Sequence, residues 1–244
     1  MTDNVELYDP QISYKQKDLL YENVGGGRFR DVSAQSGPAF QIKHVGRGAA
    51  IGDFDNDGDL DIVIADCGGP ALLFRNDGGN RNHWIAVRAR GRESNRFGIG
   101  AKVRVKAFYR GASRSQLRQI TGGSGWANGN NELQAHFGPG DAANADTVRI
   151  EWPSGTVQEF YNVAPRQTLT YTEPPRLLAI ATNGVPQFAL KGGRFMQYDI
   201  QASTDLAAWS SVGTVTITNM SGTAQIVDTN APYSTRGFYR AVSR

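Results

Sequence analysis

Apolar residues recur at every second position along most of the chain, whereas the three-to-four-residue spacing of an amphipathic helix is nearly absent. The alternation is clearest at 102–106 and at 147–152. A three-residue connection, Pro153–Gly155, follows the second segment, and alternation resumes at 156–160. Because Pro and Gly favour tight turns, these segments predict a β-hairpin. The whole pattern predicts an all-β protein.

The strand pattern is interrupted at Glu173–Arg176, where two prolines predict a linker. Beyond it, strand-like segments recur at 198–203, 215–217 and 238–242. Several short strands separated by turns suit a small β-sandwich. We therefore expect such a module at 177–244.

An internal repeat occupies the first third of the chain. Residues 19–26 and 72–79 are identical at five of eight positions when the chain is compared with itself at an offset of 53 residues. That offset is close to the length of a propeller blade, a small sheet that needs neighbouring blades to bury its faces. Two copies cannot close a ring, so we expect an incomplete propeller. The alternative is a chance similarity between two Gly-rich hairpins.

The strongest chemical signal is an acidic loop that holds five carboxylates in nine residues. Carboxylates this close repel one another unless a cation lies among them, and hard oxygen ligands select calcium. Alternate acidic positions can converge on one point, Gly58 permits the sharp turn that follows, and the Asp59 carbonyl can add a backbone ligand. The predicted Ca²⁺ ligands are Asp53, Asp55, Asp57, Asp59 and Asp61.

This acidic loop is not an EF-hand. The twelfth position from Asp53, where an EF-hand places a bidentate Glu, is Ile64. The flanking segments are short, apolar and β-branched, which predicts that the loop joins strands rather than helices. We expect Phe54 and Leu60 to point away from the cation and to pack into the sheet. An acidic turn without a metal is the alternative interpretation.

Composition narrows the class of protein. The 244 residues include 29 Gly and 10 Pro, which is typical of a turn-rich globular chain, and the single Cys67 cannot form a disulfide within it. No run approaches 18 apolar residues, so no membrane span is expected. The N-terminus lacks the features of a signal peptide.

The net charge of +3 conceals two opposite blocks. Residues 51–79 hold seven Asp and one Arg, whereas residues 81–118 hold nine Arg and two Lys against Glu93. Because these cations alternate with apolar residues, a solvated strand face is the simplest interpretation. An anion-binding groove, for acidic polysaccharide among other ligands, is the alternative. No aromatic-interleaved motif accompanies the basic block, so nucleic acid is not an expected partner.

Two segments carry a family resemblance. Gly46–Gly52, the Asp53–Asp61 loop and the Leu72–Asn76 segment together resemble an FG-GAP/VCBS repeat, as in integrin-α-type propellers. The segments that follow resemble the ASPIC/UnbV domain, which comes after FG-GAP repeats in proteins similar to cartilage acidic protein; they are Asn82–Ile85, Asn95–Ala101, His136–Gly138 and Trp152–Gly155. The C-terminal part loosely resembles fibronectin-III-like modules of bacterial surface proteins.

This resemblance implies four segments: FG-GAP/VCBS-like repeats at 1–80, an ASPIC/UnbV-like domain at 81–172, the linker at 173–176 and the sandwich at 177–244. It implies a non-catalytic, calcium-binding, extracellular, periplasmic or cell-surface module with a protein or glycan partner. The missing signal peptide and the small number of repeats then predict an N-terminally truncated chain.

The spacing of residues in this sequence does not fit the catalytic and cofactor-binding patterns that its Gly and Ser residues suggest. Gly98 and Gly100 would need Gly at position 103 for a dinucleotide loop, and that residue is Val103. Ser124 would need Gly at position 126 for a nucleophile elbow, and that residue is Trp126. We expect no catalytic residues and assign structural roles to His44, His83 and His136. The alternative is an accessory end of a secreted enzyme, with Ser124 or residues upstream carrying the chemistry.

Overall fold

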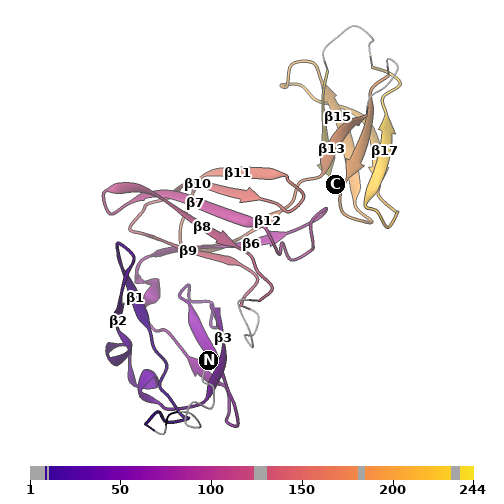
Figure 1. Ribbon diagram of the computed structural model, residues 1–244. Helices are drawn as coiled ribbons and strands as arrows, with labels where there is room; N and C mark the ends of the chain where they lie inside the picture. Colours follow the sequence, from indigo (N-terminus) through magenta and orange to yellow (C-terminus); the bar gives the residue numbers. More distant parts are fainter. Residues whose placement is uncertain (1–8, 10, 124–130, 181–184, 232–236) are drawn as a thin grey trace.

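The computed structural model describes residues 9, 11–123, 131–180, 185–231 and 237–244 (Figure 1). Nearly all its regular structure is β-strand, arranged in small separate sheets, so the prediction of an all-β fold is confirmed. The chain runs from an N-terminal region of short strands, through a middle domain of two sheets, to a C-terminal module of two further sheets.

The N-terminal region contains one hairpin and one three-stranded sheet. The hairpin joins β1 (Tyr21–Gly25) to β2 (Arg28–Asp31), and the sheet has the order β3 (Gly46–Gly52), β4 (Asp61–Asp66), β5 (Leu72–Phe74), with antiparallel neighbours. Short 3-10 helices lie at Ser33–Gln35, Pro38–Gln41 and Gly79–Arg81. A small core of Phe40, Ile64 and Phe74 lies on one face of the sheet. As predicted, strands rather than helices flank the acidic loop.

The middle domain is a sandwich of a four-stranded and a three-stranded sheet. The four-stranded sheet has the order β11 (Val157–Val163), β10 (Ala145–Glu151), β7 (Lys102–Tyr109), β8 (Ala112–Gln119). The three-stranded sheet has the order β12 (Gln167–Thr172), β6 (His83–Arg90), β9 (Ala135–Gly140). Strands β12 and β6 are parallel, and the remaining neighbours are antiparallel.

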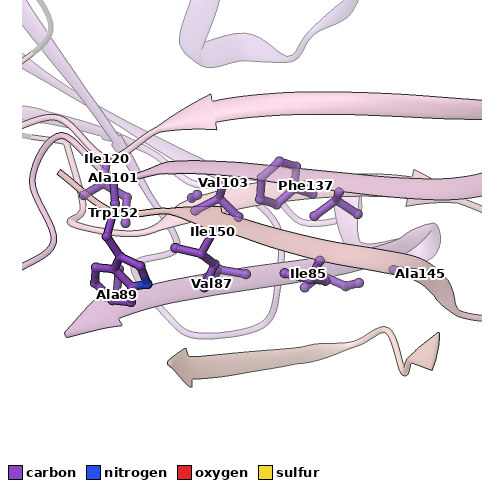
Figure 2. Close-up of a cluster of buried hydrophobic side chains, with 13 residues drawn as sticks. Ile85, Val87, Ala89, Ala101, Val103, Ile120, Phe137, Ala145, Ile150 and Trp152 are labelled. Atoms are coloured by element: carbon purple, nitrogen blue, oxygen red, sulfur yellow. The ribbon is translucent and has the colours of Figure 1, made fainter. Parts of the chain in front are cut away.

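The core of the middle domain follows directly from the alternating sequence. Inward residues such as Val103, Val148 and Ile150 are fully buried between the sheets, with Phe137 from the opposite sheet (Figure 2). Strands β10 and β11 pair in the predicted hairpin, and Gly155 in their connection has a φ of 87°. Period-2 patterning was therefore sufficient to find these strands and the faces that they bury.

The C-terminal module is a small sandwich of two three-stranded sheets, as predicted. One sheet has the order β13 (Arg176–Ile180), β14 (Gln187–Lys191), β17 (Thr223–Val227), and the other has the order β16 (Ser210–Thr216), β15 (Gln197–Ser203), β18 (Phe238–Ser243). Its core contains Leu190, Tyr198, Ile200 and Ile217. A relationship to fibronectin-III modules remains a prediction.

The connection between the middle domain and the C-terminal module is anchored by Glu173. Its buried carboxylate accepts hydrogen bonds from the N–H groups of Arg92, Glu93 and Ser94 at 2.7–2.9 Å, and from the hydroxyls of Ser94 and Ser154. Burial by itself would raise the pKa of Glu173, but the hydrogen bonds outweigh burial and hold this pKa below its ordinary value of 4.5. The carboxylate thus orders a loop some 80 residues away in the sequence.

A membrane-spanning helix is not found: among the described residues, no helix has the length and apolar character needed to cross a bilayer.

Candidate metal centre

The acidic loop connects the paired ends of β3 and β4. Gly52 and Asp61 are cross-strand partners, so the two ends of the loop are fixed by the sheet. Within the loop, Asn56 and Gly58 have positive φ values of 60° and 97°. Asn and Gly tolerate this conformation better than other residues, which explains how nine residues turn back so tightly.

Three of the five predicted ligands converge. Asp53, Asp55 and Asp61 each offer an oxygen, and these atoms all lie within 4.8 Å of one another. Asp61 is buried, Asp53 is partly buried and Asp55 is exposed. Burial raises the pKa of the Asp53 carboxyl, with the neighbouring charges of Asp57 and Glu132 adding to the effect, although the N–H groups of Gly58 and Asp57 oppose it. Hard, anionic oxygens at this spacing suit a calcium ion.

Asp53 and Asp61 also organise the backbone around them. Asp53 accepts the N–H groups of Asp57 at 3.1 Å and Gly58 at 3.0 Å. Asp61 accepts those of Phe54 and Asn76, both at 2.8 Å. Among the described residues, none donates a hydrogen bond to Asp55. The group therefore contains two carboxylates that shape the fold and one that faces solvent.

Asp57 and Asp59 are not part of the convergent group. Asp57 accepts the N–H of Asp59 at 3.0 Å. The buried Asp59 points toward the end of β5, where one carboxylate oxygen accepts the N–H groups of Gly78 and Gly79 at 3.1 and 2.9 Å. The role of Asp57 and Asp59 as metal ligands remains a prediction. Their visible contacts hold the loop and the following connection together.

The expectation for Phe54 is wrong. Its side chain is 67% exposed, whereas Leu60 is partly buried. The loop extends beyond the last paired residues of β3 and β4, so no sheet surface lies beneath position 54.

The middle domain packs directly against the acidic loop. His136 Nε2 lies 3.0 Å from the Gly58 carbonyl, and the His136 ring stacks at 6.0 Å on Trp84. A Cβ on Gly58 would lie 2.0 Å from the Trp84 ring, so this glycine is required by close approach as well as by φ. This second requirement was not predictable from a local motif, because Gly58 and Trp84 are far apart in the chain.

Glu132 is another neighbour that sequence analysis missed. Its carboxylate accepts the Asp53 N–H at 3.2 Å and forms a 2.8 Å ion pair with Arg88. Its backbone N–H donates to the Ile51 carbonyl at 3.2 Å. No local motif surrounds Glu132, and only the packing of the middle domain brings it to the loop.

The histidines have the local contacts of structural residues. His83 Nδ1 lies 2.7 Å from the Ala142 carbonyl, and the buried His44 lies 2.5 Å from the Asp18 carboxylate. Asp18 is an acidic partner 26 residues from His44 in the sequence, which fixed-spacing patterns could not reveal. Ser124 and Trp126 lie outside the described residues.

The N-terminal region and the middle domain each match a known protein family. Residues 12–64 match the FG-GAP-like repeat family. Residues 91–177 match the ASPIC and UnbV family. The acidic loop belongs to the first match, and most of the middle domain belongs to the second, so both resemblances seen in the sequence are confirmed.

Similar proteins align with about half of the chain. Over 122 residues, it is 37% identical to Cartilage acidic protein 1 of Homo sapiens and of Mus musculus; over 124 residues, it is 36% identical to that of Xenopus tropicalis. These alignments cover 49–50% of this chain and 18% of each relative. The chain therefore spans about a fifth of the length of these relatives.

Proposed function

We propose that this chain is part of a non-catalytic, calcium-stabilised binding module that works outside the cell or in the cell envelope, with protein or glycan as partner. The observation that carries the proposal is the convergence of Asp53, Asp55 and Asp61 in a loop of the FG-GAP-like repeat. The match to the FG-GAP-like repeat family and the similarity to Cartilage acidic protein 1 support an extracellular, non-catalytic role. Folds of this kind carry many functions, so the loop itself must be tested.

Calcium would act here as a structural ion. Asp53 and Asp61 already order both arms of the loop through backbone hydrogen bonds, and the Gly58 turn packs on Trp84 of the middle domain. A cation held by these carboxylates relieves their mutual repulsion and fixes the loop against that domain. Asp57 and Asp59 complete the predicted ligand set.

Isothermal calorimetry with Ca²⁺ tests the proposal. Asp55→Ala is the most informative variant because the Asp55 side chain is exposed and accepts no hydrogen bond from the part of the chain that the structure describes. We expect the wild type to bind with a Kd of roughly 0.1–1 mM, as extracellular calcium modules do, and the variant to lose that binding. Asp77→Ala, at another exposed carboxylate, is the matched control. No heat at ~10 mM Ca²⁺, or equal affinity in the Asp55 variant, contradicts the proposal.

A second candidate function is the binding of an acidic polysaccharide. The outward residues of β7 are Lys102, Arg104 and Lys106, which form a row on the outer face of the four-stranded sheet. Among the described residues, no ion pair involves any of these three cations. Retention on heparin beyond ~0.5 M salt, where exposed charges are strongly screened, would support this function. Loss of retention in a Lys102→Ser, Lys106→Ser variant would locate it.

A further inference from the structure

The C-terminal module contains a cavity of about 620 Å³ that neither family match covers. The first residues of strand β15 lie beside the middle domain, where Arg92 lies over the Tyr198 ring. The cavity lies at the opposite end of this strand. Its described lining includes Trp209, Tyr239 and Asp228, together with hydroxyl and amide side chains. The volume falls within the range of roughly 300–1,000 Å³ of small-molecule sites.

Trp209 is held at this cavity by neighbouring residues. Its indole N–H donates to the Leu206 carbonyl at 3.1 Å, and the Arg240 guanidinium lies 4.1 Å from the ring centroid. Arg240 is fixed in turn by Gln201 at 2.8 Å. Asp205 accepts two N–H groups within the same loop, at 2.8 and 3.0 Å. Trp209 is thus a half-buried aromatic residue, outside the hydrophobic core, whose orientation is fixed in advance.

A buried carboxylate, Asp228, lines the same cavity as Trp209. Asp228 accepts the Tyr239 hydroxyl at 2.9 Å and the Asn230 N–H at 3.1 Å. Burial and the Asp228 hydrogen bond raise the pKa of Tyr239 to about 12, so the phenol keeps its proton at neutral pH. An ionised carboxylate has about four acceptor sites, which leaves Asp228 able to accept donors from a ligand.

We infer that this cavity binds a neutral saccharide. The apolar C–H face of a sugar ring packs against an aromatic face, and its hydroxyls both donate to a carboxylate and bond to Ser, Thr and Asn side chains. The lining supplies these groups in Thr204, Ser210, Ser211 and Asn230. The buried charge of Asp228 disfavours acidic ligands. The inference rests on the proposed function of a binding module, and it adds the class of ligand that the module binds.

Calorimetry of the full chain with a panel of neutral tetrasaccharides, built from glucose, mannose, galactose or xylose, tests the inference. We expect at least one to bind, Trp209→Ala to weaken that binding about tenfold or more, and Trp209→Phe to weaken it less. Asn230→Ala, at an exposed lining residue, should weaken binding about threefold without affecting the fold. Phe195→Ala, which removes an exposed aromatic ring elsewhere in the module, is the matched control.

Three outcomes overturn the inference: no panel member binds at ~10 mM, folded Trp209→Ala binds as tightly as the wild type, or an acidic tetrasaccharide binds more tightly than every neutral one. Thermal unfolding of each variant establishes that it is folded. The calcium proposal is tested separately, because Asp55→Ala should leave saccharide binding unchanged and Trp209→Ala should leave calcium binding unchanged.

Discussion

The two copies of the internal repeat adopt different structures. In the first copy, Leu19 and Tyr21 are 60% and 53% exposed, and within the described residues β1 pairs with β2 alone. In the second copy, Phe74 is 8% exposed and packs edge-on against Phe40 at 5.1 Å. Five identical residues in eight are therefore compatible with an exposed hairpin and with a strand of a packed sheet.

The Gly-Gly pair that ends each copy shows the cause of the difference. Gly25 and Gly26 take positive φ values of 87° and 60° and turn the chain into a hairpin. Gly78 has an extended φ of 178°, and it donates its N–H with Gly79 to Asp59. The second copy follows an acidic loop that the first copy lacks, and carboxylates from that loop decide its path.

We expect the largest difference between the two copies when the aromatic ring is removed from each. Phe74→Ala should reduce the free energy of unfolding by about 4 kcal/mol, because it removes the ring that packs against Phe40 in a small core. Tyr21→Ala should change it by less than about 0.5 kcal/mol, because that side chain is exposed. Urea unfolding measures both. Similar effects in the two variants would contradict the comparison.

A glycine substitution tests the acidic loop itself. Gly58→Ala should lower the free energy of unfolding by about 3 kcal/mol, because the added Cβ would overlap the Trp84 ring and the φ of residue 58 is 97°. Gly25→Ala, at φ 87° with no atom within 4 Å, should cost only about 1 kcal/mol. Thermal unfolding of both variants separates the clash from the backbone effect. Equal losses would show that Trp84 does not pack on the loop in solution.

The carboxylates can be tested without metal. In the presence of a chelator, Asp61→Ala should lower the free energy of unfolding by about 2–3 kcal/mol, because the N–H groups of Phe54 and Asn76 lose the buried carboxylate that accepts them. The exposed Asp77→Ala should stay within about 0.5 kcal/mol of the wild type. A wild-type-like Asp61 variant would mean that the loop depends on calcium rather than on these hydrogen bonds.

Glu173 extends the comparison to another loop held by a buried carboxylate. At pH 7, Glu173→Gln should lower the free energy of unfolding by about 2 kcal/mol, because a neutral amide replaces the charged carboxylate that accepts the hydrogen bonds of Ser94 and Ser154. The pKa of Glu173 is lowered by folding, so its contribution is present above the ordinary value of 4.5 and is lost as pH falls through the lower folded pKa. The difference in the free energy of unfolding between the wild type and the variant should therefore become smaller at acidic pH. Urea unfolding at several pH values measures it, and a constant gap from pH 7 to 3 would contradict this role.

The fold was largely predictable because its signals are local. Alternation at 102–106 and 147–152 identified the strands whose inward residues form the middle core, and β-branched flanks identified the strands on either side of the acidic loop. The position of Phe54 was not predictable in the same way. Alternation assigns a side chain to a face only where a sheet exists, and that residue lies beyond its end.

The candidate metal centre was only partly predictable. The spacing of Asp53, Asp55 and Asp61 identified the convergent group, but equal spacing also included Asp57 and Asp59, whose side chains make other contacts. Which carboxylates converge depends on φ at two residues and on backbone donors outside the loop. These donors become neighbours only after the sheet forms.

The sequence by itself determined the all-β class, the strand positions and the acidic loop, because patterns of period 2 and turn residues act over a few positions. Only the tertiary structure decided which repeat copy buries its aromatic residue, which carboxylates meet, and that Glu132, Trp84 and His136 surround the loop. It also brought Trp209, Asp228 and Tyr239 to one cavity. These contacts join residues tens of positions apart, and no local pattern of polar and apolar residues encodes such distances.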